Sequence, residues 1–246
     1  MSASVPLMMF AEEDVEGGGK SIEDDFAYRN NVHQASLHIR LAFLRKVYSL
    51  LFIQLAATVI IGFTFMFTPI LSFYIHNNDW LLSVSFVLSI VILIALHWKR
   101  REYPTNLILL AAFTLIQAYT VGVVVTYFEQ FVVLQALVLT VVVVGGLTAY
   151  TLQTKRDFSS LGSFLFSCLG ALITGSLMTV VFGGSPFELV TSVGGALLFC
   201  LFIIYDTQEM MKRLSPEEYI LATINLYMDI INLFLYILKS LESARR

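Results

Sequence analysis

The chain has 246 residues, of which 57% are hydrophobic and 13% are charged, whereas a soluble domain carries about 25% charged residues. Its mean hydropathy of +0.78 is typical of a membrane protein. The net charge of -3 is small and spread over many loops, so nothing indicates binding to nucleic acid.

The first part of the chain is polar, and residues 1–45 are expected to form a cytosolic N-terminal tail, acidic at first and then amphipathic. Its apolar piece VPLMMF is shorter than the core of a secretory signal and is followed by the acidic, glycine-rich AEEDVEGGGK. Residues 46–246 are expected to form a transmembrane helix bundle.

Seven long apolar runs follow the tail, each near the roughly 20 residues that a helix needs to cross about 30 Å of hydrocarbon. They cover residues 47–73, 80–98, 105–128, 131–153, 160–182, 187–209 and 218–238. Open sheets are excluded in lipid, and the runs are too long and continuous for barrel strands. The sequence therefore predicts an all-α membrane protein, a seven-transmembrane-helix bundle.

Basic residues give the orientation of the bundle. They precede the first run and follow the second, fourth and sixth, whereas the other loops between runs contain none. By the positive-inside rule the N-terminus and the loops 2–3, 4–5 and 6–7 are cytosolic. If the last run crosses fully, the basic residues Lys239, Arg245 and Arg246 lie on the non-cytosolic side, against the positive-inside rule. The alternative is therefore six spans plus a re-entrant last segment. We expect seven crossings, because a continuous helix satisfies its own backbone.

Small residues recur in the fourth, fifth and sixth runs, where they allow helices to approach closely. They are Gly145-Gly146, Ser163, Ser167, Ala171, Gly175 and Gly194-Gly195. We expect these positions to serve helix packing rather than chemistry.

Two aspartates lie inside apolar runs. Asp229 belongs to a polar stripe of the last run, with Asn225, Asn232 and Tyr236 on the same helix face. Asp206 ends the sixth run, and the two aspartates lie roughly 9 Å and 18 Å from the cytosolic boundary at 1.5 Å per residue. They can meet if a helix extends beyond the membrane or tilts. An acid inside a membrane is a candidate functional residue, because burying its charge costs about 2.5 to 3.5 kcal/mol.

A carboxylate pair in low dielectric would share one proton, because both groups cannot ionise cheaply. Deprotonation would leave two negative charges that repel each other or attract a cation. Calcium prefers carboxylate and carbonyl oxygens, so Asp206 and Asp229 together are a candidate transient calcium site.

Other charges lie on the same cytosolic side. Arg100, at the end of the second run, either marks the membrane boundary or reaches Asp206. Glu217 and Glu218 either concentrate cations at a cytosolic mouth or are favourable acids at a helix N-terminus.

Several segments together resemble the transmembrane BAX inhibitor motif family, also called the lifeguard family, and its Golgi members most of all. They are HIRLAFLRKVYSLL, FGGSPFELV, FIIYDT, KRLSPEEYI and LYMDIINLFLYIL, and the resemblance extends from SIEDDF onward. It implies a bundle with a central last helix that leaks calcium from intracellular stores in a pH-dependent way, limits their calcium content and inhibits apoptosis. It also implies the Golgi membrane as location, with the endoplasmic reticulum as the alternative.

By this resemblance Asp206 and Asp229 are the proton-sharing, pH-sensing pair on the ion path, and Arg100 is a latch on Asp206. One feature departs from the family. Some relatives pair an acid in span two with an arginine near the end of span seven, but residues 81–95 are apolar or hydroxyl residues here and Lys239 stands at the far end. That second ion pair is therefore in doubt.

Two other functions are compatible with the sequence. The protein could be an anti-apoptotic scaffold without flux, or an intramembrane aspartyl protease, whose paired aspartates would activate water. The protease is disfavoured because Asp229 follows Tyr-Met instead of Gly-x-Gly, and no Pro-Ala-Leu follows. We therefore expect no enzyme and no cofactor, with calcium as the permeant ion. The expected partners are the lipid bilayer and other apoptosis or calcium-channel membrane proteins.

Overall fold

The computed structural model describes residues 37–78, 80–154, 156–182 and 185–245, and most of the expected N-terminal tail lies outside these ranges. The described residues form helices and connecting turns only. The helices are α3 (Leu37–Phe67), α4 (Pro69–His76), α5 (Trp80–Lys99), α6 (Thr105–Val125), α7 (Gln130–Gln153), η3 (Ser159–Leu161), α8 (Gly162–Phe182), α9 (Ser185–Lys212), η4 (Pro216–Glu218) and α10 (Tyr219–Arg245). Seven of them are long and apolar enough to cross a membrane, as the sequence predicts.

The first apolar run differs from the expected single span over 47–73. Helix α3 begins at Leu37 and ends at Phe67, and a separate short helix, α4, begins at Pro69. Proline has no backbone N–H and its ring clashes with the preceding turn, so it starts a helix well but cannot continue one. The polar residues before the run therefore extend the first spanning helix, and Pro69 ends it.

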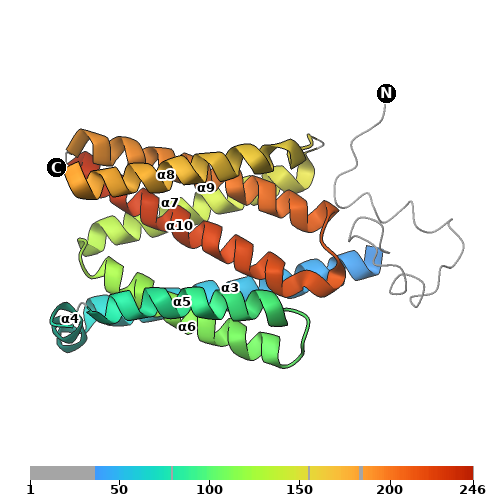
Figure 1. Cartoon of the computed structure of the whole chain (residues 1–246), viewed down its shortest axis with the longest axis horizontal. Coiled ribbons are helices and arrows are strands. Elements are labelled where there is room, and N and C mark those ends of the chain that lie inside the picture. The colour runs from blue at the N-terminus through green and yellow to red at the C-terminus, as the bar shows by residue number, and fades with distance from the viewer. Residues whose placement is uncertain (1–36, 79, 155, 183–184, 246) are drawn as a thin grey trace, which may run out of the picture. The chain divides into compact units, whose positions relative to one another are not determined.

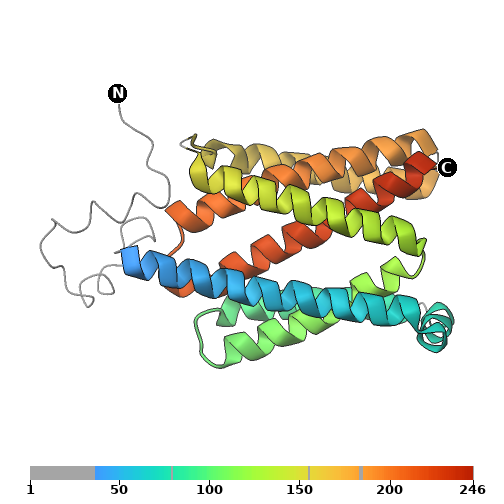
Figure 2. The same cartoon turned by 180° about the vertical axis from the view of Figure 1, so that it is seen from behind.

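The described helices divide into two compact units. Unit 1 contains residues up to 46, 136–216 and 228–246, and unit 2 contains residues 47–135 and 217–227. In unit 1, α8 and α9 lie side by side (Figures 1 and 2). The largest fully buried side chains of this unit are Leu165, Ile203, Met210, Leu233 and Leu238. Four of these five come from α9 and α10, so those two helices supply most of the core of unit 1.

Unit 2 is built around aromatic and aliphatic side chains of α3, α5, α6 and the first part of α10. Helices α5 and α6 lie side by side (Figures 1 and 2). Phe113 on α6 and Tyr227 on α10 are fully buried, and their rings meet edge to face at a centroid distance of 6.2 Å. This geometry is the one that aromatic quadrupoles favour.

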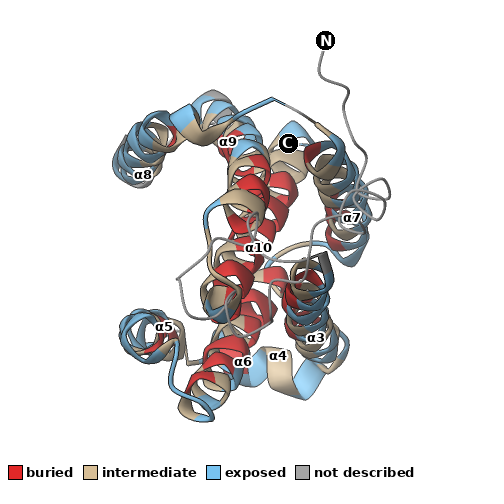
Figure 3. Ribbon diagram, turned by 90° about the vertical axis from the view of Figure 1, so that its right-hand side faces the viewer, coloured by how far each residue is buried: buried red, intermediate tan, exposed pale blue. Residues whose placement is uncertain are grey.

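Helix α10 is the most buried of the spanning helices. The buried share of its most apolar stretch is 67%, against 44% for α6 and 6% for the span that contains α8. Figure 3 shows buried residues along much of α10, whereas α5 and α8 are mostly exposed or intermediate. The helix is unbroken from Tyr219 to Arg245, so it is long enough to cross and needs none of the turn that a re-entrant segment requires.

The small residues serve close packing at some of the expected positions only. A Cβ on Gly195 would lie 2.5 Å from the Tyr236 ring, and one on Gly175 would lie 3.5 Å from Thr191. The expectation is wrong for the other glycines, Gly145, Gly146 and Gly194, where no atom lies within 4 Å of such a Cβ. It is also wrong for Ser163, Ser167 and Ala171, which are exposed because that face of α8 is turned away from the core of unit 1.

Candidate functional site

The candidate site is formed by the two aspartates, which come from α9 and α10 of unit 1. Helix α9 carries Glu188 in its first turn and Lys212 in its last turn, charges that both suit the helix dipole. Asp206 lies between them, two turns before the end, and is half-buried. Asp229 lies in the middle of α10 with 6% of its surface exposed.

The structure brings the two carboxyl groups together. The carboxyl groups of Asp206 and Asp229 lie within interaction distance of each other. An ionised carboxylate can only accept, so a hydrogen bond between them requires a proton on one of the two groups. Oδ2 of Asp229 is buried, and no N–H or O–H group of the described residues donates a hydrogen bond to it. The pair is therefore arranged to hold one proton.

Apolar side chains surround the pair. Ile203 on α9 and Leu233 on α10, one turn away from the respective aspartates, are fully buried, and Ile230 is nearly so. In such a setting two negative charges would repel each other with little screening. Loss of the shared proton would therefore act directly on the contact between α9 and α10.

The same two helices also meet between the middle of α9 and its first turn. The rings of Phe199 and Tyr236 stack at a centroid distance of 5.7 Å, and Gly195 gives the Tyr236 ring the room to approach. Glu188 Oε1 lies 3.6 Å from Lys239 Nζ. Lys239 thus has an acidic partner on α9, although its sequence context left the second ion pair in doubt.

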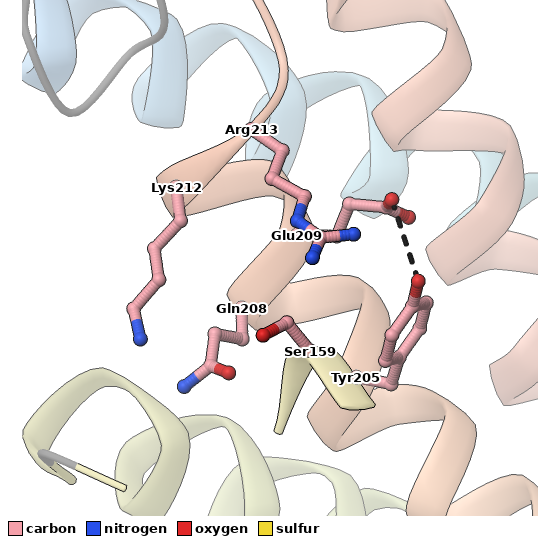
Figure 4. Close-up of a pocket in the computed structure, with 6 residues that line it drawn as sticks. All are labelled: Ser159, Tyr205, Gln208, Glu209, Lys212 and Arg213. Carbon is pink, nitrogen blue, oxygen red and sulfur yellow. Dashed lines mark hydrogen bonds between the residues drawn. The ribbon is translucent and has the colours of Figure 1, made fainter. Parts of the chain in front are cut away.

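A small pocket lies at the other end of α9, the expected cytosolic end, one turn from Asp206. Its empty volume is about 200 Å³, and Figure 4 shows its lining residues Ser159, Tyr205, Gln208, Glu209, Lys212 and Arg213. The Tyr205 hydroxyl donates a long hydrogen bond of 3.5 Å to Glu209 (Figure 4). A Cβ at Gly162 would lie 2.7 Å from that hydroxyl, so the start of α8 needs a glycine there.

Gln208 holds the loop before α8 against α9. Its Oε1 accepts a hydrogen bond of 2.6 Å from the Phe158 N–H, and its Nε2 donates one of 2.7 Å to the Arg156 carbonyl. The sequence-based reasoning missed this residue. A glutamine two residues after an intramembrane aspartate is a signal that could have found it, because its buried amide must have partners.

Arg100 lies in unit 2, where it pairs with Glu218. The Arg100 guanidinium is 3.3 Å and the Arg101 guanidinium 2.9 Å from Glu218 Oε1, and the Glu218 side chain is 13% exposed. Two arginines therefore neutralise this carboxylate, which makes it a weak collector of cations at a cytosolic mouth. Glu217, by contrast, is exposed. The latch between Arg100 and Asp206 stays a prediction.

The remaining residues of the predicted stripe are less buried than Asp229. Asn225, Asn232 and Tyr236 are half-buried, and Asn232 donates a hydrogen bond of 2.9 Å to the Met228 carbonyl of its own helix. Across the described ranges, no group of three or more His, Cys, Asp or Glu side chains could hold a metal ion. A calcium ion at the aspartate pair would thus take its other ligands from water and backbone carbonyls.

The fold and the site define a multi-pass membrane protein with an acid pair inside the bilayer. The chain belongs to the family of inhibitors of apoptosis-promoting Bax1, whose model matches residues 40–246. This confirms the family resemblance that the sequence motifs indicate.

Three relatives illustrate the similarity. Protein lifeguard 4 of Mus musculus is 48% identical over 226 residues, which are 92% of this chain and 95% of the relative. The Golgi anti-apoptotic protein of Vaccinia virus strain Lister is 46% identical over the same shares of both chains. Bax inhibitor 1 of Schizosaccharomyces pombe is 40% identical over 219 residues, 89% of this chain and 82% of the relative. The family and these relatives are named for inhibiting apoptosis and not for an enzymatic activity.

Proposed function

We propose that this chain is a pH-sensitive calcium leak of intracellular stores that lowers their calcium content and thereby restrains apoptosis. Its relatives named as anti-apoptotic support the cellular role, and the Golgi protein among them supports the Golgi membrane as location. The observation that supports the leak is the close approach of the Asp206 and Asp229 carboxyl groups, which lie on two spanning helices.

The proposed gate is the single proton of this pair. With the proton in place the hydrogen bond holds α9 against α10, and the leak is closed. When the proton leaves, two carboxylates remain, which repel each other and offer oxygens to a calcium ion. The leak is therefore expected to rise as pH rises through the titration of the pair.

Arg100 is proposed to stabilise the deprotonated Asp206. In unit 2 it is paired with Glu218 at 3.3 Å. Glu218 and Asp206 would then compete for the same guanidinium, which gives the proposed latch two alternative partners.

The test is calcium entry into liposomes that contain the purified protein, followed against pH. Wild type is expected to show flux that grows with pH, whereas Asp206→Asn and Asp229→Asn lose the pH response, because neither can share a proton between two carboxyls. Asp157→Asn is the matched control: it removes an exposed carboxylate of unit 1 outside the spanning helices and should keep the response.

The alternatives predict different results. No flux from wild type, or a pH response that survives both substitutions, would overturn the leak. A scaffold would protect cells from apoptosis equally well with both aspartates replaced. An intramembrane protease would cleave a model transmembrane peptide and lose that cleavage with either aspartate.

A further inference from the structure

Helix α10 carries a second polar stripe, on a different face from Asp229. Tyr219, Thr223 and Tyr227 stand four residues apart on α10, about 80°, 120° and 160° around the helix from Asp229 at about 100° per residue. All three are buried in unit 2, at 8%, 0% and 0% exposure. Buried polar side chains need hydrogen-bond partners, so this stripe must meet polar groups of other helices.

The partners come from α3 and α6, which also place polar groups four residues apart. Tyr219 accepts a hydrogen bond of 3.1 Å from Asn106 on α6. Eight residues further along each helix, Thr114 on α6 accepts one of 2.8 Å from Gln54 on α3, and Tyr227 lies 2.8 Å from the Thr58 hydroxyl. These groups form a polar column, defined here as Gln54, Thr58, Asn106, Thr114, Tyr219, Thr223 and Tyr227.

The column has no hydroxyl hydrogen left to donate at its deep end. Thr58 donates to the Gln54 carbonyl at 2.9 Å, and Thr114 donates to the Leu110 carbonyl at 2.8 Å. Thr58 must therefore accept from Tyr227, whose only hydrogen is then used as well. The groups that can still form hydrogen bonds in this part of the column are therefore mainly oxygen acceptors.

Two buried carbonyl oxygens of the column lack a donor altogether. Oε1 of Gln54 and Oδ1 of Asn106 have no hydrogen-bond partner in the part of the chain that the structure describes, although the residues are 3% and 2% exposed. Such an orphaned acceptor is costly in a medium without water. Asn106 and the Gln54 partner Thr114 are separated by about 12 Å along α6 at 1.5 Å per residue. The two unsatisfied oxygens therefore mark two levels of one column.

We propose that the polar column is a water-binding site of unit 2, with water bound to Asn106 Oδ1 near the cytosolic end and to Gln54 Oε1 deeper in the membrane. The ligand must donate hydrogen bonds, because the unsatisfied groups are acceptors and the hydroxyls at the deep level have no hydrogen to spare. Water meets this requirement and commonly satisfies buried polar groups in this way. The site is separate from the aspartate pair, since it uses a different face of α10 and no carboxylate.

Hydroxyl-radical footprinting with mass spectrometry tests this site in the full-length protein in nanodiscs, because radicals formed from bound water oxidise the side chains beside it. Tyr227 is fully buried and should nevertheless be oxidised in wild type. Gln54→Leu should lower the oxidation of Tyr227 several-fold and leave that of Tyr219 unchanged. Asn106→Leu should lower the oxidation of Tyr219 and leave that of Tyr227 unchanged, since it removes only the acceptor at the level of Tyr219.

Thr140→Val is the matched control. Thr140 is also buried in a spanning helix, at 3% exposure, but within the described ranges its hydroxyl bonds to the Ala136 carbonyl of its own helix and to no other helix. This variant should leave the oxidation of Tyr227 unchanged. Thermal unfolding of each variant shows whether it is folded. An unoxidised Tyr227 in wild type, or equal oxidation in folded Gln54→Leu, would refute the proposed site.

Discussion

Lys239 Nζ lies 3.6 Å from Glu188 Oε1, which joins the last part of α10 to the first turn of α9. The sequence leaves in doubt the ion pair that some relatives form between spans two and seven, because residues 81–95 contain no acid. In this chain the acid comes from α9 instead. The ion pair therefore lies on the same two helices as Asp206 and Asp229, at the other end of their interface.

A double-mutant cycle measures this pair. Lys239→Gln and Glu188→Gln should each lower the thermal stability slightly, and the double variant should be no worse than the poorer single variant. The pair is partly exposed, at 37% and 30% of the side chains, so the coupling energy should be about 0.2–1 kcal/mol. Fully additive effects in detergent or nanodiscs would show that the two charges do not interact.

Gly195 is predicted to be the most sensitive glycine of α9. A Cβ there would come within 2.5 Å of the Tyr236 ring, so Gly195→Ala must push the ring off Phe199 and should destabilise the protein by about 1–3 kcal/mol. The adjacent Gly194 is the matched control, because no atom lies within 4 Å of a Cβ at that position. Gly194→Ala should be neutral or slightly stabilising, since alanine favours helix more than glycine does.

The outcome at Gly195 is checked by thermal unfolding and by a second substitution. Tyr236→Leu removes the ring that the new methyl group would meet, so Gly195→Ala should cost less in that background. Equal losses for Gly194→Ala and Gly195→Ala would mean that helix flexibility, and not the contact with Tyr236, explains both effects.

The sequence predicted the seven spans and the family, because hydropathy and short sequence motifs are local signals, and the role of the two aspartates stays a prediction. It did not predict which small residues pack. Spacing alone placed Ser163, Ser167 and Ala171 on one face, but whether that face meets another helix depends on how α8 is rotated, which spacing does not determine. Gly194 and Gly195 are likewise indistinguishable in the sequence.

The sequence also did not predict which polar residues contact each other in the folded chain. The sequence allows Glu218 to lie at a cytosolic mouth or at a helix N-terminus, and it does not predict the partners Arg100 and Arg101 that the structure gives it. The sequence predicts no role for Gln54 and Tyr227, because single polar residues inside apolar runs are common. Their four-residue spacing with Thr58 and Thr223 was the available signal, and only the hydrogen bonds show that these stripes meet.

Substitution of Glu218 is predicted to lower the free energy of unfolding more than substitution of its neighbour Glu217. Glu218→Gln removes the charge that two arginines share, and it should lower the free energy of unfolding by about 1 kcal/mol, given that the arginines are partly exposed. Glu217 is exposed, so Glu217→Gln should change it by less than about 0.5 kcal/mol. Thermal unfolding of both variants checks this, and the reverse order would contradict the assignment of the ion pairs.

Asp157, in the loop before α8, should titrate below the ordinary range. Its pKa is lowered because Ser159 donates hydrogen bonds to the carboxylate from its side chain and its backbone N–H, with a smaller contribution from Lys212. The N–H bond is 3.1 Å long and the Lys212 ammonium is 3.5 Å away. A lowered pKa means that the folded state favours the ionised form. This stabilisation is fully present above the ordinary pKa of about 4 and is lost as pH falls through the lowered value.

Carbon-detected NMR of the labelled Asp157 carboxyl group measures this pKa directly. Ser159→Ala removes the hydroxyl donor and should move the midpoint upward, toward that of a free aspartate. Lys212→Gln is the comparison variant and should move it upward by less, because the ammonium contributes less than the serine. A larger shift in Lys212→Gln than in Ser159→Ala would show that the ion pair, and not the hydrogen bonds, holds this loop carboxylate in its ionised form.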